Sequence, residues 1–504
     1  MVISRRPDAL LNPQFFAEDG AVWYLQAYSF GWAISLLHTH SGYFQTLPRL
    51  VAALALLVPL RFAPLLMNLI GLTVQVLPVN IMLSWRCRDW APLPVRSWMA
   101  VAYIALPNSR EVHVAITNAQ WHLGLMACMV MLAAIPKTVS GRLLDGTLLL
   151  LSGLTGPFAL LLIPVAIVFW WVRRQRWTLA LTGILVLTSG MQISALVRTA
   201  AASRPKVGLG ATPELLIRLL AGQVYLGAVL GQRNDPAHKP LWLLCAAAVL
   251  GTAVIVYTLR GAELELKLFV IFCLLALIAG LMSPKVSMTT PQWPVLLQAG
   301  ALRYWFLPMT AFVWALIWCA LVGGSTWVRA VSVAGLTAML FGIAADWRYP
   351  AYPNLQFPAK AAAFEAAAPG TVVTIPIFPS GWVVRLVKKG PLCHSLPIGA
   401  IDQPAPNGSI RASAPKVSGW VAGYEPIRGV SIFVDGAYAG ASTPKGRRPD
   451  VESVYPGFPQ RDESWAVLLD PSKMEQGNRN IRARATDVGG CEADIAEVNT
   501  RVTQ

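Results

Sequence analysis

The run "HKPLWLLCAAAVLGTAVIVYTL" spans residues 238–259 and carries no charged side chain after Lys239. About 20 consecutive apolar residues are enough for one helix to cross a bilayer. Similar runs lie at 63–84, 97–106, 119–136, 143–152, 158–172, 177–197, 268–283, 302–322 and 330–345. Together they predict a polytopic α-helical membrane protein of about ten spans. The shorter run 47–60, cut by Pro48 and Pro59, is expected to form a helix lying at the membrane interface.

The composition points the same way. Hydrophobic residues make up 55% of the 504 residues and charged residues only 13%, whereas a soluble domain is about 25% charged. The net charge of +16 comes mainly from residues 1–345, which hold 24 Lys+Arg and 10 Asp+Glu. This basic excess fits cytoplasmic anchoring of the helices or a phosphate-binding surface. No basic–aromatic patch indicates a nucleic-acid partner.

The distribution of Lys and Arg predicts the orientation of the helices. The loops 85–96, 137–142, 173–176, 260–267 and 323–329 hold 11 Lys+Arg in 37 residues, against 7 in 75 for the opposite loops 107–118, 153–157, 198–237 and 284–301. The denser set is expected to be cytoplasmic, which places residues 1–62 and the tail outside. Because no span precedes Glu18, either this external segment crosses the membrane unaided or the reading frame lacks a first transmembrane helix, and we expect the second.

The tail after residue 345 has a different pattern. "FPAKAAAFEAAAPG" (357–370) predicts a short helix, and "TVVTIPI" (371–377) and "WVVRLV" (382–387) predict strands. From about 405 onward, alternating residues and Gly-rich turns predict a small β-sandwich. The expected domains are therefore 1–62 (external acidic loop with interfacial helices), 63–345 (transmembrane), 346–404 (external α/β segment) and 405–504 (β-sandwich).

Two of the seven cysteines, Cys393 and Cys491, lie in this tail. In a bacterium the tail would face the oxidising periplasm, so the two are expected to form a disulfide. No CxxC or HExxH pattern occurs, which argues against a structural zinc site.

The acids that could do chemistry are few. The motif "AEDG" (17–20) contains Glu18 and Asp19, and "PNSREVHVAITNAQWH" (107–122) offers Glu111, His113, Gln120 and His122. A carboxylate can act as general base on an acceptor hydroxyl, and a leaving phosphate needs a cation. Arg49, and Arg303 with its neighbour Tyr304, are expected near the outer membrane surface, where a lipid phosphate would lie.

Structural alternatives stand beside each assignment. Glu18 could cap a helix that begins at Asp19 or Gly20. Glu111 and His113 could be a solvated loop pair, or two ligands of a divalent metal ion, although two ligands are too few to define one. Arg49 and Arg303 could be simple interfacial anchors.

The order of "FFAEDG", "GYFQTLPRLVAALA", "PNSREVHVAITNAQWHLGL", "GLTGPF" and "LRYWFLP" over residues 12–345 resembles bacterial multi-pass glycosyltransferases of the GT-C type. "PGTVVTIPIFPSGWVVRL" (369–386) is similar to the stretch that follows their last helix, and 405–504 resembles bacterial immunoglobulin-like modules. The resemblance implies a polyprenyl-phosphate-linked sugar donor and catalysis on the outer face. It carries the family's acidic motif onto Glu18 and Asp19, and a second acidic position onto Glu111.

The leading hypothesis is thus a glycosyltransferase of the bacterial inner membrane that acts on a cell-envelope glycan or protein. Asp19 would be the general base, Glu18 its support or a metal ligand, and Arg303 with Arg49 the phosphate contacts. His113 and His122 would contact donor or acceptor. Two alternatives are a lipid-linked sugar flippase and a non-catalytic envelope protein that binds glycan. The absence of clear repeats and of acids within the spans favours the enzyme over the transporter.

Overall fold

The computed structural model describes residues 1–203, 207–391, 393–455, 458–459, 462–471 and 474–503. The chain divides into two compact units. The first, here the helical unit, comprises Met1–Pro13, His40–Pro48 and Leu65–Pro353. The second, here the mixed unit, comprises Gln14–Thr39, Arg49–Pro64 and Asn354–Gln504. The acidic motif at Glu18 and Asp19 therefore groups with the C-terminal part of the chain.

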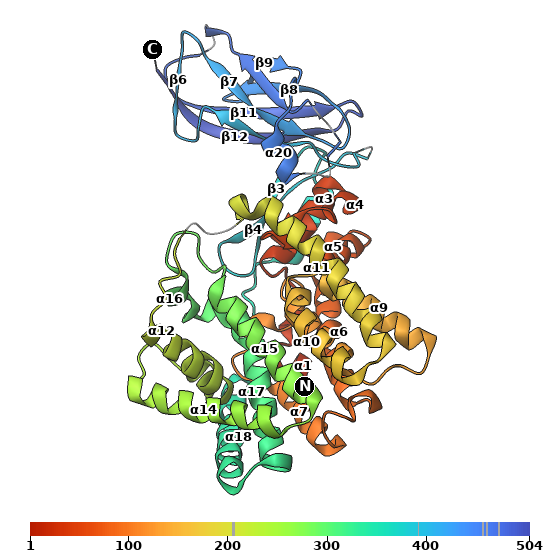
Figure 1. The fold of residues 1–504 in the computed structure, drawn as a ribbon. Coiled ribbons are helices and arrows are strands. Elements are labelled where there is room, and N and C mark those ends of the chain that lie inside the picture. The colour runs from red at the N-terminus through yellow and green to blue at the C-terminus, as the bar shows by residue number, and fades with distance from the viewer. Residues whose placement is uncertain (204–206, 392, 456–457, 460–461, 472–473, 504) are drawn as a thin grey trace. The chain divides into compact units, whose positions relative to one another are not determined.

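The described residues contain seven helices that are long and apolar enough to cross a membrane: Leu60–Leu83, Arg176–Thr199, Pro213–Arg233, Leu241–Gly261, Leu264–Met282, Ala301–Gly323 and Thr326–Asp346. Shorter helices lie between them: α7 (Leu93–Ala105), α8 (Ala119–Leu132), α9 (Val139–Gly153) and α10 (Phe158–Arg173). Every apolar run predicted from the sequence coincides with a helix. The chain is thus a helical membrane protein with a β-rich C-terminal region, drawn as blue arrows in Figure 1.

The helix at Pro213–Arg233 corrects one expectation. The sequence analysis placed these residues in a loop over 198–237, but they form α12 (Pro213–Ile217), the π-helix η5 (Arg218–Leu226) and α13 (Gly227–Leu230). Glu214, Arg218 and Gln223 interrupt the apolar pattern and hid the helix. Arg218 satisfies its charge locally, since it pairs with Glu214 at 2.8 Å and donates to the carbonyl of Pro236.

Two ion pairs, each with a buried carboxylate, join helices in this unit. Arg86 makes two hydrogen bonds, of 2.8 and 2.7 Å, to the carboxylate of Asp145, whose side chain is 1% exposed. Arg173 at the end of α10 pairs with Glu265 at the start of α15 (Leu264–Met282). Paired in this way, the charges tie neighbouring helices together without an unneutralised buried group.

The β-rich region is a two-sheet sandwich. One sheet has the order β10-β7-β5 and the other β6-β12-β11-β8-β9. Apolar residues of both sheets, including Val417, Ile432, Trp465 and Ile481, form one buried cluster between them. The bounds are β5 (Ile398–Gln403), β6 (Ser409–Arg411), β7 (Lys416–Ala422), β8 (Ile427–Val434), β9 (Ala437–Ser442), β10 (Ser464–Leu468), β11 (Gly477–Asp487) and β12 (Glu492–Thr503).

Further elements of the mixed unit lie outside the two sheets of the sandwich. They are α3 (Leu25–Phe30), α4 (Trp32–Ser35), α19 (Phe357–Ala366), α20 (Pro449–Val454) and the antiparallel hairpin of β3 (Val372–Ile377) and β4 (Trp382–Val387). Phe30 and Ile34 pack in one cluster with Ala422 of β7, Val451 of α20 and Phe458. The N-terminal segment 14–39 therefore packs, through Phe30 and Ile34, in a second hydrophobic cluster that includes Ala422 of β7 and is separate from the core between the two sheets.

Candidate functional site

The acidic motif sits at the end of a tight turn. Ala17, its first residue, has a positive φ of 47°, a conformation that side-chain-bearing residues rarely adopt. The turn is held by the β3–β4 hairpin, because the Ala17 amide donates to the Phe378 carbonyl at 2.6 Å and the Phe378 amide donates to the Phe15 carbonyl at 3.2 Å. A π-helix, η1 (Asp19–Tyr24), starts at Asp19 and runs into α3.

Asp19 is buried, with 1% of its surface exposed. A helix does begin at Asp19, but Glu18, at the N-cap position of this described segment, makes no capping hydrogen bond with its side chain. Asp19, Trp23 and Gln26 are spaced four and three residues apart, so they share one face of the η1–α3 helix. Trp23 and Gln26 of this segment contact Arg49.

Arg49, on α5 (Thr46–Ala55), is wholly buried, with 0% exposure. Its guanidinium lies 5.0 Å from the centre of the Trp23 ring, and Nη1 donates to Gln26 Oε1 at 2.7 Å. Within the described part of the chain, Nε and Nη2 have no hydrogen-bond partner. Burial lowers the pKa of Arg49 to about 9, which leaves the group cationic at neutral pH.

A buried guanidinium with two unused donors is costly unless an anion completes it. Its planar fork matches the oxygens of a phosphate or carboxylate. An interfacial anchor keeps its head group in the aqueous interface, so the buried position of Arg49 does not suit that alternative.

His38 is a neighbour of Arg49 that the sequence analysis missed. It is 2% exposed and packs against the rings of Phe30, Tyr455 and Phe458, with ring centres 5.3, 5.6 and 6.1 Å away. Burial first, and then the charge of Arg49, lower the pKa of His38 to about 4. The ring is neutral at physiological pH. No motif surrounds His38 in the sequence, because two of its ring partners, Tyr455 and Phe458, are more than 400 residues away along the chain.

A second group of charges lies in the helical unit. Arg303 forms an ion pair with Glu111 through Nη1, and its backbone amide donates to Glu111 Oε2 at 2.9 Å. The Lys285 carbonyl accepts from Arg303 Nη2 at 3.2 Å, and the Lys285 amide donates to Tyr304 Oη at 2.9 Å. Lys285 Nζ donates to Ser41 Oγ at 3.0 Å. Three of the predicted residues, Glu111, Arg303 and Tyr304, are thus brought together.

Lys285 was not predicted, although a signal for it existed. It is the one Lys or Arg in the stretch 284–301, which the charge distribution assigned to the external side. A lone cation in an otherwise uncharged external loop is a reasonable phosphate contact.

The other predicted residues of this region are buried in the helical unit. His113 Nδ1 lies 3.1 Å from Gln75 Nε2, and burial lowers the pKa of His113 well below its usual value. His122 lies between Tyr103 Oη and the Val112 carbonyl, both at 2.8 Å. Gln120 Oε1 accepts from Gln45 at 3.3 Å. These bonds resemble those of structural residues, so a role in substrate contact stays a prediction.

Among the described residues, no group of three or more His, Cys, Asp or Glu side chains is placed to hold a metal ion. Metal binding by Glu18 or Glu111 stays a prediction.

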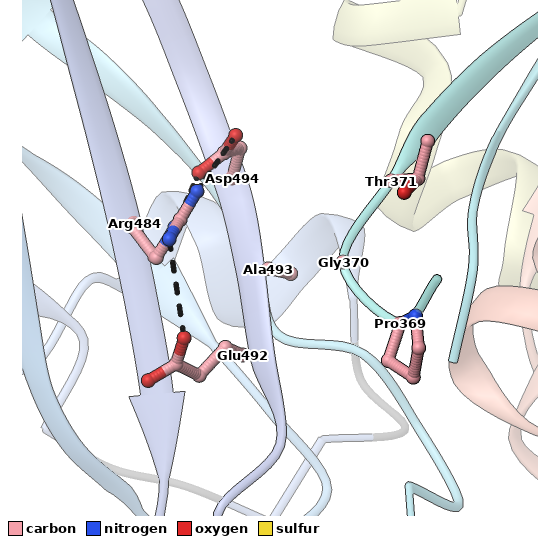
Figure 2. Close-up of a pocket in the computed structure, with 7 residues that line it drawn as sticks. All are labelled: Pro369, Gly370, Thr371, Arg484, Glu492, Ala493 and Asp494. Carbon is pink, nitrogen blue, oxygen red and sulfur yellow. Dashed lines mark hydrogen bonds and ion pairs between the residues drawn. The ribbon is translucent and has the colours of Figure 1, made fainter. Parts of the chain in front are cut away.

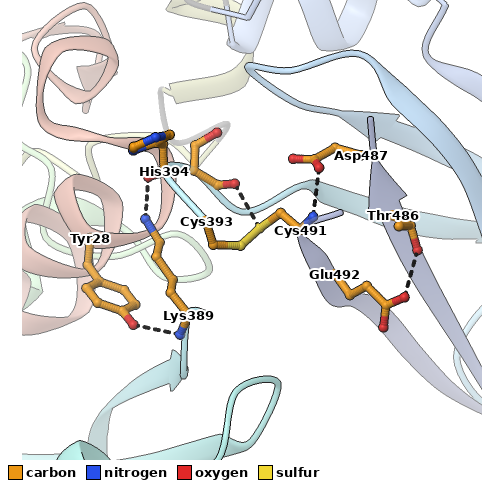
Figure 3. Close-up of a disulfide and its surroundings, with 9 residues drawn as sticks. Tyr28, Lys389, Cys393, His394, Thr486, Asp487, Cys491 and Glu492 are labelled. Carbon is orange, nitrogen blue, oxygen red and sulfur yellow. Dashed lines mark hydrogen bonds between the residues drawn. A yellow bond between two sulfur atoms is a disulfide. The ribbon is translucent and has the colours of Figure 1, made fainter. Parts of the chain in front are cut away.

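The mixed unit also contains a disulfide and a pocket. Cys393 and Cys491, the pair expected from the sequence, are joined by a disulfide with a Cα–Cα distance of 5.2 Å (Figure 3). A pocket of about 290 Å³ is lined by Pro369, Gly370, Thr371, Arg484, Glu492, Ala493 and Asp494 (Figure 2). Arg484 in this pocket already pairs with Asp494 at 2.7 Å and lies 4.0 Å from Glu492. The pocket therefore lacks the unneutralised cation that Arg49 provides.

No known family model matches the chain, and no curated protein matches it in sequence. The resemblance to GT-C glycosyltransferases and to immunoglobulin-like modules therefore stays a prediction.

Proposed function

We propose that the protein is a glycosyltransferase of the bacterial inner membrane. It would move a sugar from a polyprenyl-phosphate-linked donor to a cell-envelope acceptor, with the β-sandwich in the periplasm and the helices in the GT-C arrangement. One observation carries the proposal: the buried guanidinium of Arg49 has two donors without a partner among the described residues, and it contacts Trp23 and Gln26 of the helix that begins at Asp19. A buried cation without an anionic partner, in contact with a helix that carries a buried carboxylate, suits the transfer of a sugar from a lipid phosphate.

The proposed reaction needs a base and a cation. Asp19 accepts the proton of the acceptor hydroxyl as its oxygen forms a bond to the anomeric carbon of the sugar. The bond between that carbon and the phosphate oxygen breaks, and the phosphate leaves as an anion that Arg49 stabilises. Glu18 supports the charge and position of Asp19.

The second group of charges would also serve the donor. Arg303 already shares its charge with Glu111, which makes it a weaker phosphate ligand than Arg49. Arg303 also donates to the Lys285 carbonyl, and the Lys285 amide donates to the Tyr304 hydroxyl. We assign this group to binding the lipid-linked donor rather than to the chemical step.

The test is a transfer assay in membranes that contain labelled lipid-linked sugar, with wild-type protein and Asp19→Asn. Loss of a general base is expected to lower the rate by about 100-fold or more. Asp89→Asn is the matched control, because Asp89 is an exposed acid whose nearest cation, Arg88, lies 3.6 Å away. If the Asp19 variant loses less than about tenfold, or ~1.4 kcal/mol of barrier, Asp19 is not the base.

The same membranes separate the alternatives. Movement of lipid-linked sugar across vesicles without any transfer product would identify a flippase. Glycan binding by the wild type, with neither transfer nor movement, would identify a non-catalytic envelope protein. Either result would replace the proposal.

A further inference from the structure

We infer that the Cys393–Cys491 disulfide holds the proposed catalytic segment in place, so that the Asp19 site is sensitive to thiols. The effect on activity rests on the proposed function, whereas the effect on structure does not.

The disulfide joins the sandwich to a short segment, here the bridge loop, which comprises residues 388–391 and 393–396. On the sandwich side, Cys491 closes the turn between β11 and β12, where its amide donates to Asp487 Oδ1 at 2.8 Å and its carbonyl accepts from the Asp487 amide at 3.0 Å. Cys491 is 6% exposed and packs with Leu396 and Ala493. One end of the disulfide is therefore rigidly placed.

The bridge loop in turn holds α3. The Lys389 amide donates to Tyr28 Oη at 3.0 Å, and the Lys389 Nζ lies 4.9 Å from the centre of the Tyr28 ring (Figure 3). The Leu396 amide donates to the Ser29 carbonyl at 2.6 Å. Through these contacts, residues near both ends of the bridge loop bind the last turn of α3.

The helix that the bridge loop contacts continues back to Asp19. η1 and α3 together run from Asp19 to Phe30. Tyr24 stacks on Tyr28 with an interplanar angle of 9° and lies 5.1 Å from the Phe15 ring. The sandwich, the disulfide, the bridge loop and the helix thus form one connected path to the proposed base.

Reduction of the disulfide would break this path. A thiolate of a dithiol reductant attacks Sγ of Cys393, which is less buried than Cys491, and forms a mixed disulfide while Cys491 leaves as a thiolate and takes up a proton. The second thiol of the reductant then releases Cys393 as a thiol. The two cysteines gain two hydrogens, and the reductant becomes a disulfide. The bridge loop then keeps only its hydrogen bonds and packing.

The test is hydrogen–deuterium exchange of the full-length protein in detergent, comparing wild type with Cys393→Ser/Cys491→Ser. We expect amides of residues 25–30 to exchange at least tenfold faster in the variant, while amides of 306–318 in the helical unit do not change. Cys245→Ser, which removes a free cysteine in α14 (Leu241–Gly261), is the control and should behave as wild type. Equal exchange at 25–30 in both proteins would overturn the inference.

Two further measurements keep the test decisive. If the double variant does not fold, wild-type protein reduced with dithiothreitol takes its place, and re-oxidation should restore slow exchange. Tyr28→Phe keeps the disulfide but removes the acceptor for Lys389, and should speed exchange at 25–30 by a smaller factor.

A fall in the transfer rate of at least tenfold on reduction supports thiol control of the site, and an unchanged rate overturns it. A wild type without transfer activity would refute the proposed function, while the exchange data would still decide the role of the disulfide.

Discussion

The guanidinium of Arg49 lies 5.0 Å from the centre of the Trp23 ring, in a side chain that is entirely buried. Stacking on an indole and one hydrogen bond to Gln26 stabilise the cation, but they leave two of its nitrogens unused within the described chain. Buried arginines that serve stability have a carboxylate or several carbonyls around them. Arg49 therefore has the surroundings of a ligand-binding residue, at a cost in stability.

Arg49→Met should accordingly separate stability from activity. Methionine has a similar length and no unsatisfied donors, so we expect the free energy of unfolding to hold or to rise by up to about 3 kcal/mol. Transfer should fall at least about 100-fold, because the leaving phosphate loses its cation. Chemical unfolding in detergent and the membrane transfer assay measure the two effects.

The control is the same substitution at Arg86. Arg86→Met leaves Asp145 buried without its cation and should lower the free energy of unfolding by about 3–5 kcal/mol. If Arg49→Met destabilised the protein as strongly as Arg86→Met, Arg49 would be a structural residue and not an anion ligand.

Gly20 allows the acidic turn to close on Phe15. A Cβ on Gly20 would lie 2.8 Å from Phe15 Cβ and 2.9 Å from Cδ2, too close for any real contact. Gly20→Ala should therefore push the start of η1 away, lower the free energy of unfolding by about 1–3 kcal/mol and reduce transfer. Gly183→Ala, in α11 (Arg176–Ser203) with open space around it, should be neutral or slightly stabilising. Equal thermal unfolding of both variants would show that the turn tolerates the methyl group.

The helices were predictable because a long apolar run indicates a membrane helix without any information about its tertiary contacts. The helix at 213–233 escaped because Glu214, Arg218 and Gln223 break its apolar pattern, and only the folded chain shows that Arg218 pairs with Glu214. The β-rich character of the chain from about 405 onward followed from alternating residues and Gly-rich turns.

The site was predictable only as a set of residue types. The sequence indicated Asp19, Arg49, Glu111 and Arg303 through their place in an apolar chain. It could not indicate that Arg49 lies under Trp23, or that His38 enters a cage made by Phe30, Tyr455 and Phe458, because such contacts join distant segments. It also gave no sign that Phe378, far along the chain, holds the turn before Glu18.

The Glu111–Arg303 pair should show strong coupling in a double-mutant cycle. Its side chains are 13% and 24% exposed, so each single change, Glu111→Gln or Arg303→Gln, should cost about 1–3 kcal/mol of unfolding free energy. The double variant should cost less than the sum, since it leaves no unpaired charge. Chemical unfolding of the four proteins in detergent gives the coupling energy. Additive losses would mean that the two residues act independently, against their assignment as one unit.

His38 should make the mixed unit sensitive to acid. Burial lowers its pKa to about 4, from an ordinary value of 6.5. The unfolded chain therefore binds more protons than the folded one between these values, so the stability that the neutral ring contributes is complete above about pH 6.5 and is lost as the pH falls toward 4. The full loss is roughly 3 kcal/mol.

His38→Phe, which fits the same aromatic cage, should remove this part of the pH dependence. Unfolding of wild type and variant in detergent between pH 4 and 7 measures it, and the effects of all other groups are common to both curves. The wild-type curve should fall more steeply below pH 6.5. Parallel curves would mean that protonation of His38 does not lower the free energy of unfolding. That is the behaviour of a solvent-exposed histidine with no cation near it.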